Sequence, residues 1–448
     1  MKRTTLVVEQ QVQKQKLGTW TGPDLGLSTK SGYLIPYGKS SEDMEVFLRY
    51  SNVLKDGQFV ELCGFSIYTM VKRATALEES FPFNDFRSAH PVLVSFPPDV
   101  IWLGREKGAE VLNDGIEELL PPGEQGFEPS EVAQIAQTFS ELARSSRKTY
   151  GFWQGIVQQR FRGVKYSKLL MEYAFAAASR VKAKAMTGIV PVIDPATPGS
   201  VSMAHRTNLA YIHHQNDLLE QGASLVPAYL YTIQLNSGMV KPDKWTPRHR
   251  RILQNAKAAL QLESQTGLDG VHLSVRGIDR ISQRRPRVAV LLRFIDGLRE
   301  ICDDAKLPLF WGRSSLAGLG GLDYGVDYAS CPINLGGGDV YSDGGPRDEL
   351  PKFGNLLNVH SRDIWNRDQL VLASEQGELP DLGNVRNMPT DTELENPHDY
   401  RLHFSKPYNV AGIRYLAEDW VSHTRGGEIE PGREYLQTFD GFAGWSAH

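Results

Sequence analysis

Apolar runs separated by helical patterns organise the middle of the chain. Near-continuous apolar strands are predicted at 188–194, 224–234, 270–277, 307–312 and 328–333. Helical patterns lie between them, at 202–221, from Thr246-Pro247 onward and at about 286–304. Strands that are buried on both faces are typical of a parallel sheet covered by helices, because each crossover places a helix against the sheet.

The earlier part of the chain adds strands at 59–64, 91–94 and 100–103 and helices at 130–145 and 166–184. The count and spacing of these strands favour an α/β fold of the (β/α)8 TIM-barrel type over an open, doubly wound sheet. No G-x-G-x-x-G or G-x-x-x-x-G-K-[ST] motif follows a strand, which also argues against the nucleotide-binding open folds.

Changes in composition predict three parts. Residues 1–55 lack the periodicity of a core element and are interpreted as an N-terminal arm or cap, residues 56–340 as the barrel, and residues 341–448 as a C-terminal extension packing on the barrel. The Gly/Asp/Asn-rich region 336–397 is either a long functional loop over the barrel mouth or a subunit contact.

Composition limits the class of protein. With 448 residues, 41% of them hydrophobic, the chain can bury a large core. It has no bilayer-length apolar run and no signal-peptide pattern, so we expect a cytoplasmic protein without a membrane partner. Cys63, Cys302 and Cys331 are widely spaced, and no H-E-x-x-H occurs, so no disulfide framework or metal site is predicted. The sequence does not identify a cofactor.

Charge is unevenly distributed along the chain. Residues 241–299 contain 13 Lys or Arg against 5 Asp or Glu, whereas residues 371–448 contain 6 against 13. Arg248, Arg250 and Arg251 cluster at a predicted helix start, as expected of a nucleic-acid contact. The alternative is a solvated helix face neutralised by the acidic C-terminal region, and an oligomer or protein complex is also possible.

Polar residues at the strand ends predict a binding site. In such barrels the chemistry lies at the carboxyl ends of the strands, and guanidinium groups there suit a carboxylate or phosphate. The alternative is that the arginines form structural ion pairs and that the glycines only turn the chain. The predicted substrate-binding residues are Gln234, Arg276, Arg313, Asn334, Gly336, Gly337 and Gly338.

Two side chains are candidates for the chemistry itself. Asp194 directly follows a buried strand and is a candidate general base or nucleophile, although an Asp there can also cap the next helix. His205 lies near the mouth end of the helix at 202–221. Together with the arginines, these residues predict a site for an anionic small molecule or a nucleic acid.

A late segment of the chain resembles a known family. Residues 314–331 combine a short helix with the run G-V-D-Y-A-S-C, and this is similar to the late barrel segment of the tRNA-guanine transglycosylase family. Residues 403–420 are similar to that family's terminal helical segment. The family's nucleophilic aspartate position is Ala329 here, and its zinc-binding cysteines and histidine are not matched. The resemblance implies glycosyl or base transfer in which Asp327 or Asp194 takes over the carboxylate role.

Two classes of function follow. The first is a barrel-mouth enzyme, a transglycosylase-like transferase or a hydrolase, acting on an anionic substrate such as a nucleotide or nucleic acid. The second is a noncatalytic TIM-barrel subunit for binding or assembly in a nucleic-acid-associated complex. The enzyme hypothesis predicts that Asp194, Arg276 and Arg313 converge on one pocket.

Overall fold

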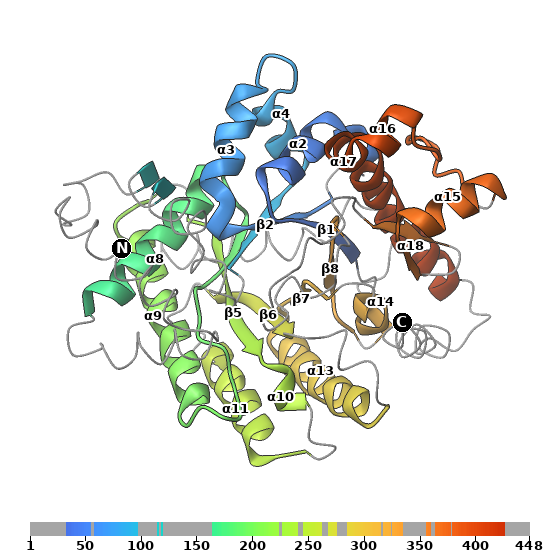
Figure 1. Ribbon diagram of the computed structural model, residues 1–448. Helices are drawn as coiled ribbons and strands as arrows, with labels where there is room; N and C mark the ends of the chain where they lie inside the picture. Colours follow the sequence, from blue (N-terminus) through green and yellow to red (C-terminus); the bar gives the residue numbers. More distant parts are fainter. Residues whose placement is uncertain are drawn as a thin grey trace.

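Eight parallel strands close into one barrel in chain order, with helices around it (Figure 1). This confirms the predicted (β/α)8 fold. The computed structural model describes residues 33–54, 58–96, 114–115, 118–119, 164–223, 226–240, 245–261, 268–275, 285–314, 317–323, 325–334, 355–359, 363–377 and 379–425. The strands are β1 (Tyr33–Gly38), β2 (Val60–Cys63), β3 (Val92–Ser95), β4 (Ala185–Thr187), β5 (Ala228–Leu235), β6 (Leu268–Val275), β7 (Leu309–Gly312) and β8 (Tyr328–Pro332).

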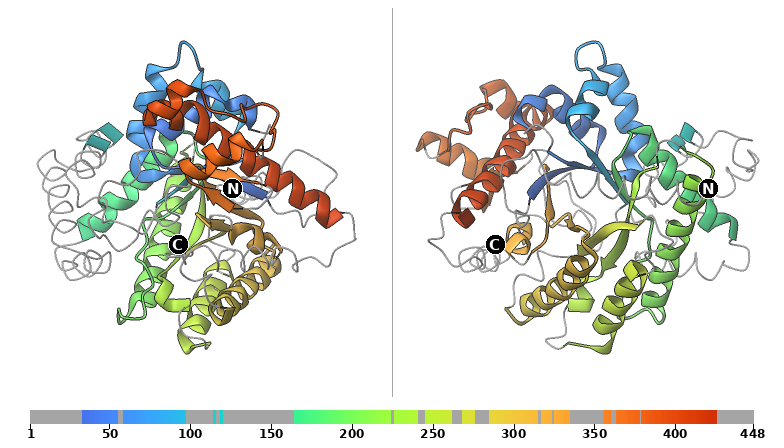
Figure 2. Two further views of the ribbon diagram at one scale, coloured as in Figure 1. Left: turned by 45° about the vertical axis from the view of Figure 1, so that its right-hand side comes forward. Right: turned by 180° about the vertical axis from the view of Figure 1, so that it is seen from behind.

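Helices form the outer layer, and Figure 2 shows them around the barrel from two further directions. Within the described ranges, no helix has both the length and the apolar character needed to cross a bilayer. The helices that lie between strands of the barrel are α2 (Ser41–Arg49), α3 (Ile67–Ala76), α4 (Phe83–Ala89), α8 (Val164–Arg180), α9 (Ser200–Glu220), α10 (Ser237–Val240), α11 (Pro247–Gln261), α13 (Arg285–Ala305) and α14 (Ala317–Asp323).

The barrel begins earlier than the sequence pattern predicts. Residues 33–38, which we assigned to an arm ending at residue 55, form β1 and pair with both β2 and β8. The strand signal is weak because β1 contains Pro36, a residue that usually marks an edge strand. Helix α2 follows, with a capping box between Ser40 and Asp43. The arm boundary at residue 55 is therefore wrong.

The fourth strand is also displaced from its predicted place at 188–194. Strand β4 ends at Thr187, and the chain rejoins β5 only at a bridge between Ile193 and Leu235. In the gap, the Asn208 amide from α9 accepts a hydrogen bond from Thr232 N at 2.7 Å and donates one to Thr232 O at 2.9 Å. One side chain thus replaces the missing strand neighbour, which leaves residues 188–192 free to bulge.

Aromatic side chains fill the amino-terminal half of the barrel. Tyr328 stacks on Phe310 with ring centroids 4.5 Å apart and meets Phe59 edge to face at 5.4 Å. Leu93 and Leu230 pack into the same cluster. This apolar floor closes one end of the barrel, so polar side chains in the interior can face only the carboxyl end.

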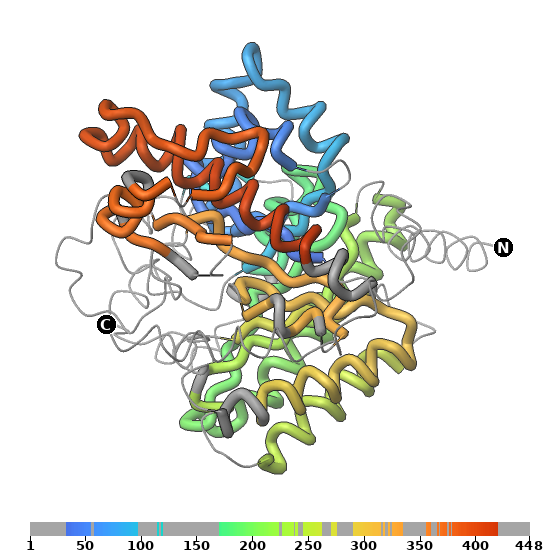
Figure 3. The backbone as a smooth tube through the Cα atoms, turned by 90° about the vertical axis from the view of Figure 1, so that its right-hand side faces the viewer, coloured from blue at the N-terminus to red at the C-terminus, as the bar shows by residue number. Residues whose placement is uncertain are grey.

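The C-terminal part completes the helical layer beside β1. Figure 3 shows α18 next to the first elements of the chain, and α18 contacts β1 and α2. This part comprises β9 (Leu356–Asn358), β10 (Asp363–Trp365), α15 (Arg367–Glu375), α16 (Asp391–Glu395), α17 (Pro397–Asp399), the π-helical turn Tyr400–Ser405 and α18 (Lys406–Arg425).

Two buried polar side chains fasten α18 to the barrel. Lys406 is 3% exposed, and its Nζ lies 2.5 Å from Asp43 Oδ1 and 2.6 Å from Glu42 Oε1. Asn409 donates to Ile333 O and accepts from Leu357 N, which joins the end of β8 to β9. These contacts fix the turns that follow β1 and β8 at the barrel mouth.

Asp327 lies at the amino-terminal end of β8, beside the apolar floor. Its Oδ2 accepts a hydrogen bond from Leu309 N at 2.7 Å, and its backbone oxygen accepts one from Tyr33 N. Burial, with a smaller contribution from Asp303, raises the pKa of the carboxyl group from 3.8 to about 6. Asp327 therefore joins three strands, β1, β7 and β8.

We expect Asn208→Ala to lower the free energy of unfolding by about 2–4 kcal/mol, because two buried backbone groups of Thr232 lose their partner. Urea unfolding would measure this. His213→Ala, at an exposed position of the same helix, serves as the control and should change stability by about 0.5 kcal/mol or less. A loss in Asn208→Ala no larger than in the control would show that Asn208 does not bridge the gap.

Asp327→Asn should make stability less dependent on pH. The folded state holds the Asp327 proton between about pH 4 and 6 and the unfolded state does not, so this group's contribution to stability falls as the pH rises. Asparagine keeps an acceptor for Leu309 N and carries no charge. We expect Asp327→Asn to gain about 1–3 kcal/mol relative to the wild type between pH 4 and pH 7.

Urea unfolding at the two pH values would test this expectation. Asp304→Asn removes the same charge from an exposed position of α13 and serves as the control. An equal gain in both variants would attribute the effect to net charge instead of to the buried Asp327 carboxyl group.

Candidate functional site

A layer of polar side chains lies above the apolar floor, on the inward positions of the strands. Inward residues alternate along each strand, so Phe59 and Glu61 on β2 share one face, as do Leu230 and Gln234 on β5. On β2, β3, β5 and β8 the inward residue near the carboxyl end is polar and its counterpart below is apolar, whereas Arg313 follows the end of β7. We call this set the polar layer; it comprises Glu61, Ser95, Gln234, His272, Ser274, Arg313 and Ser330.

Glu61 and His272 face each other across the barrel interior. Both are fully buried, at 0% and 1% exposure, and Glu61 Oε1 lies 3.7 Å from His272 Nε2. Gly312 provides the space between them, because a Cβ at that position would collide with the imidazole and lie 3.1 Å from Glu61 Oε1. The absence of a side chain at the end of β7 therefore allows the pair to form.

The Glu61 carboxylate is stabilised in its charged form. Burial alone would raise its pKa, but the neighbouring His272, Arg313 and Ser330 side chains outweigh burial and hold the pKa below its usual value. The Ser95 hydroxyl also donates to Oε1. Glu61 is therefore an ionised carboxylate at neutral pH, close to a histidine.

Arg313 follows β7 and reaches into the layer from the rim. Its Nη2 donates to Ser274 Oγ at 2.6 Å, and its backbone N–H donates to Ser330 Oγ at 2.6 Å. Its φ of 55° is in the left-handed region, which is uncommon for a non-glycine residue. Half-buried at the carboxyl end of the barrel, Arg313 is a cation that a ligand can approach.

Gln234 closes the layer on the opposite side. It pairs in register with Ser274 on β6, and its Nε2 donates to Phe96 O at 2.7 Å. Because Phe96 O only accepts, the amide nitrogen must face it and Oε1 must face elsewhere. The contacts run from Ser95 to Glu61, from Arg313 to Ser274 and from Gln234 to the end of β3, so the polar layer forms a ring inside the barrel.

The structure brings together two of the sequence-predicted binding residues. Gln234 and Arg313 belong to the polar layer, where both adjoin Ser274. Asn334 follows β8 at the same end of the barrel and is exposed. Arg276, Gly336, Gly337 and Gly338 lie outside the described residues, so the predicted convergence of Arg276 with Arg313 stays a prediction.

Asp194 lies on the barrel rim and stabilises a turn. Its Oδ1 accepts from Ala196 N at 2.8 Å and its Oδ2 from Asn236 Nδ2 at 2.9 Å. These bonds hold the segment after β4 against the segment after β5. Among the described residues, no hydrogen bond joins Asp194 to the polar layer, and the N-cap of α9 is Gly199 without a side-chain cap bond. The geometry therefore favours a role in the turn over both the general base and the helix cap.

The other two predicted catalytic residues lie away from the polar layer. His205 Nδ1 is 2.9 Å from the Tyr231 hydroxyl, on the outward side of β5, and burial lowers its pKa. It therefore lies in the helix–strand layer outside the barrel. Asp327 lies at the opposite, amino-terminal end of β8. Neither position suits a residue that acts at the barrel mouth.

The predicted nucleic-acid contacts are exposed at the first turns of α11. Two of them bond to neighbouring segments: Arg248 Nη1 donates to Pro195 O, ahead of α9, at 2.5 Å, and Arg251 Nη2 donates to Ser202 Oγ in the first turn of α9 at 3.0 Å. Arg250 is exposed on the same turn. Arg248 and Arg251 thus already have a structural role between the two helices.

Sequence reasoning missed Glu61 and His272, although both lie in predicted strands. Each is a single polar residue within an apolar run, V-E-L-C on β2 and V-H-L-S on β6. Both residues lie before the ends of their strands, so a search for polar residues at strand ends does not find them. The available signal was the alternation of inward and outward side chains along each strand. It places Glu61 and His272 inside the barrel, where an ionisable side chain is costly to bury.

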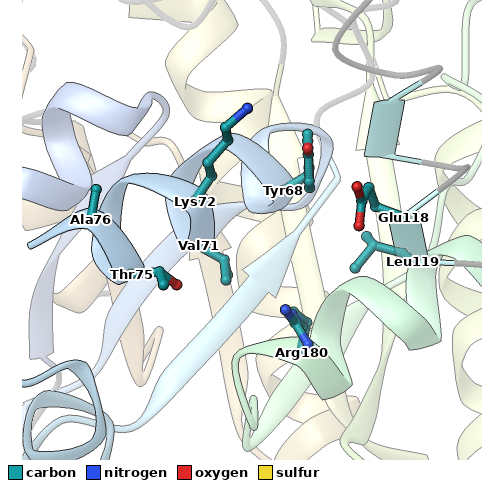
Figure 4. Close-up of a pocket in the computed structure, with 8 residues that line it drawn as sticks. All are labelled: Tyr68, Val71, Lys72, Thr75, Ala76, Glu118, Leu119 and Arg180. Carbon is teal, nitrogen blue, oxygen red and sulfur yellow. The ribbon is translucent and has the colours of Figure 1, made fainter. Parts of the chain in front are cut away.

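A separate pocket lies outside the barrel, between α3 and the end of α8 (Figure 4). It has a volume of about 540 Å³ and is lined by Tyr68, Val71, Lys72, Thr75, Ala76, Glu118, Leu119 and Arg180. Its ionisable groups include both signs of charge, and none belongs to the polar layer. Across the described ranges, no group of three or more His, Cys, Asp or Glu side chains is arranged to hold a metal ion.

Comparison of the chain with protein-family models and with curated proteins finds no match in either case.

Proposed function

We propose that this protein is a barrel-mouth enzyme that binds an anionic substrate at Arg313 and transfers protons through Glu61 and His272. The observation that carries the proposal is a fully buried Glu–His pair in the same layer as a half-buried arginine. Ionisable groups held in a closed interior cost stability, and such arrangements cluster at functional sites.

Arg313 supports an anionic substrate. Its guanidinium is a planar fork of donors at the carboxyl end of the barrel, and this geometry matches a carboxylate or phosphate. Glu61 partly offsets its charge from below, so the ligand would approach from the rim. This arrangement favours a small anion over a neutral substrate.

The Glu61–His272 pair supports proton transfer in hydrolysis or glycosyl transfer. With Nε2–H directed at the Glu61 carboxylate, His272 Nδ1 is left as an acceptor. It would take a proton from an attacking water or hydroxyl as that oxygen bonds to the substrate, and return it to the leaving group as the old bond breaks. Glu61 would stay ionised and stabilise the transient imidazolium, so the protons balance over the cycle.

A noncatalytic binding barrel is the alternative, and the same residues would then only recognise the anion. A nucleic acid is the second class of ligand, supported by the exposed Arg250 beside Arg248 and Arg251. We favour a small molecule, because Arg248 and Arg251 bond to Pro195 and to Ser202 of α9 and the polar layer lies inside the barrel.

Turnover decides between catalysis and binding. We would incubate the wild type with sugar phosphates, nucleoside monophosphates and acidic glycosides and follow products by NMR. At least one compound should be converted, and Glu61→Gln or His272→Gln should each lower its rate by about 100-fold or more.

The matched controls Glu220→Gln and His213→Gln, both at exposed positions of α9, should keep the wild-type rate. Binding of these anions with no conversion of any would instead support the noncatalytic alternative. Full turnover in folded His272→Gln would remove this pair from the mechanism.

Anion binding should depend on Arg313. Titration with inorganic phosphate, followed by melting temperature, should show at least about tenfold weaker binding in Arg313→Gln, since the charge-assisted bonds are lost. Arg250→Gln, an equal change of charge at an exposed position of α11, should bind within about twofold of the wild type. Equal weakening in both variants would mean that phosphate responds only to net charge.

A further inference from the structure

Several acceptor atoms in the polar layer are buried without a partner. Within the part of the chain that the structure describes, Glu61 Oε2, Gln234 Oε1 and both ring nitrogens of His272 have no hydrogen-bond partner. Gln234 cannot resolve this by turning its amide, because Nε2 is required by Phe96 O. Buried polar atoms are nearly always paired, so an unpaired group of them indicates a missing partner.

Three donors of the layer are directed at other groups. The Ser95 hydroxyl donates to Glu61, Arg313 Nη2 donates to Ser274, and the Gln234 amide donates to Phe96. Glu61 Oε2 and Gln234 Oε1 can only accept, and a neutral His272 ring has one accepting nitrogen beside its N–H. A molecule that pairs these atoms must bring hydrogen-bond donors of its own.

We propose that the substrate's inserted end carries several hydroxyl or amino groups, so the ligand is a hydroxylated anion such as a sugar phosphate or a sugar acid. This inference rests on the proposed function, because Arg313 holds the anionic end. An alkyl or aryl anion of the same size would displace water from the layer and leave its acceptors unpaired. Sites built to pair with a substrate hydroxyl discriminate strongly against analogues that lack it.

Matched pairs of probes test the inference. Glucose 6-phosphate is compared with cyclohexylmethyl phosphate, which keeps the shape and charge but has no ring hydroxyls, and glucuronate is compared with cyclohexanecarboxylate. Calorimetric titration of the wild type should show the hydroxylated member of at least one pair binding at least about tenfold more tightly. The pair that shows the preference distinguishes a phosphate from a carboxylate ligand.

A substitution at Gln234 tests whether the polar layer causes the preference for hydroxylated ligands. Gln234→Met removes the Oε1 acceptor and should reduce the hydroxylated-to-plain affinity ratio by about tenfold, with the plain anion bound within about twofold of the wild type. Gln221→Met, at an exposed position, should leave the ratio unchanged. If Gln234→Met does not fold, the wild-type comparison alone decides.

The outcomes separate the two proposals. Equal affinity within both pairs, with binding lost in Arg313→Gln, would overturn the hydroxylated substrate and leave the anion site standing. An unchanged ratio in folded Gln234→Met would also overturn it. Failure of every probe to bind, or binding unaffected by Arg313→Gln, would overturn the anion site and this inference with it.

Discussion

The buried carboxylate of Glu61 needs hydrogen-bond donors and an opposite charge, and the side chains in the carboxyl-terminal half of the barrel supply them. A charge enclosed by eight strands and an aromatic floor has lost its water, and an isolated ion there would cost several kcal/mol. Its neighbours on β3, β6, β7 and β8 therefore point at it or at one another. Ser95 donates to it, Arg313 supplies the opposite charge, and His272 faces it at 3.7 Å.

The backbone adapts to this charge at two successive positions. Gly312 leaves the space that the imidazole of His272 occupies, and Arg313 adopts a left-handed conformation that costs about 1–2 kcal/mol. In that conformation its N–H meets Ser330 while its guanidinium meets Ser274. One residue thus joins β6, β7 and β8 by both its backbone and its side chain.

The fold could be predicted from the sequence because long apolar strands and intervening helices repeat along the chain, and Gln234 and Arg313 were found because they lie at strand ends. β1 was missed because Pro36 weakens its strand signal. Glu61 and His272 were missed for another reason. Their partners come from strands far apart in sequence, so only barrel closure makes a lone Glu and a lone His a pair.

Costs of several different kinds meet in the polar layer. At other places a single side chain pairs buried polar groups locally, as Asn208 does beside β4 and Lys406 does at the start of α18. In the polar layer, by contrast, a buried charge, a left-handed arginine and unpaired acceptors occur together, although apolar residues of similar volume would fill the same positions more stably. Unfavourable features of this kind are expected together at a site that is kept for function at the expense of stability. The proposal of an active site therefore rests on the combination of a buried carboxylate, a histidine and an arginine in one layer, beyond any single residue.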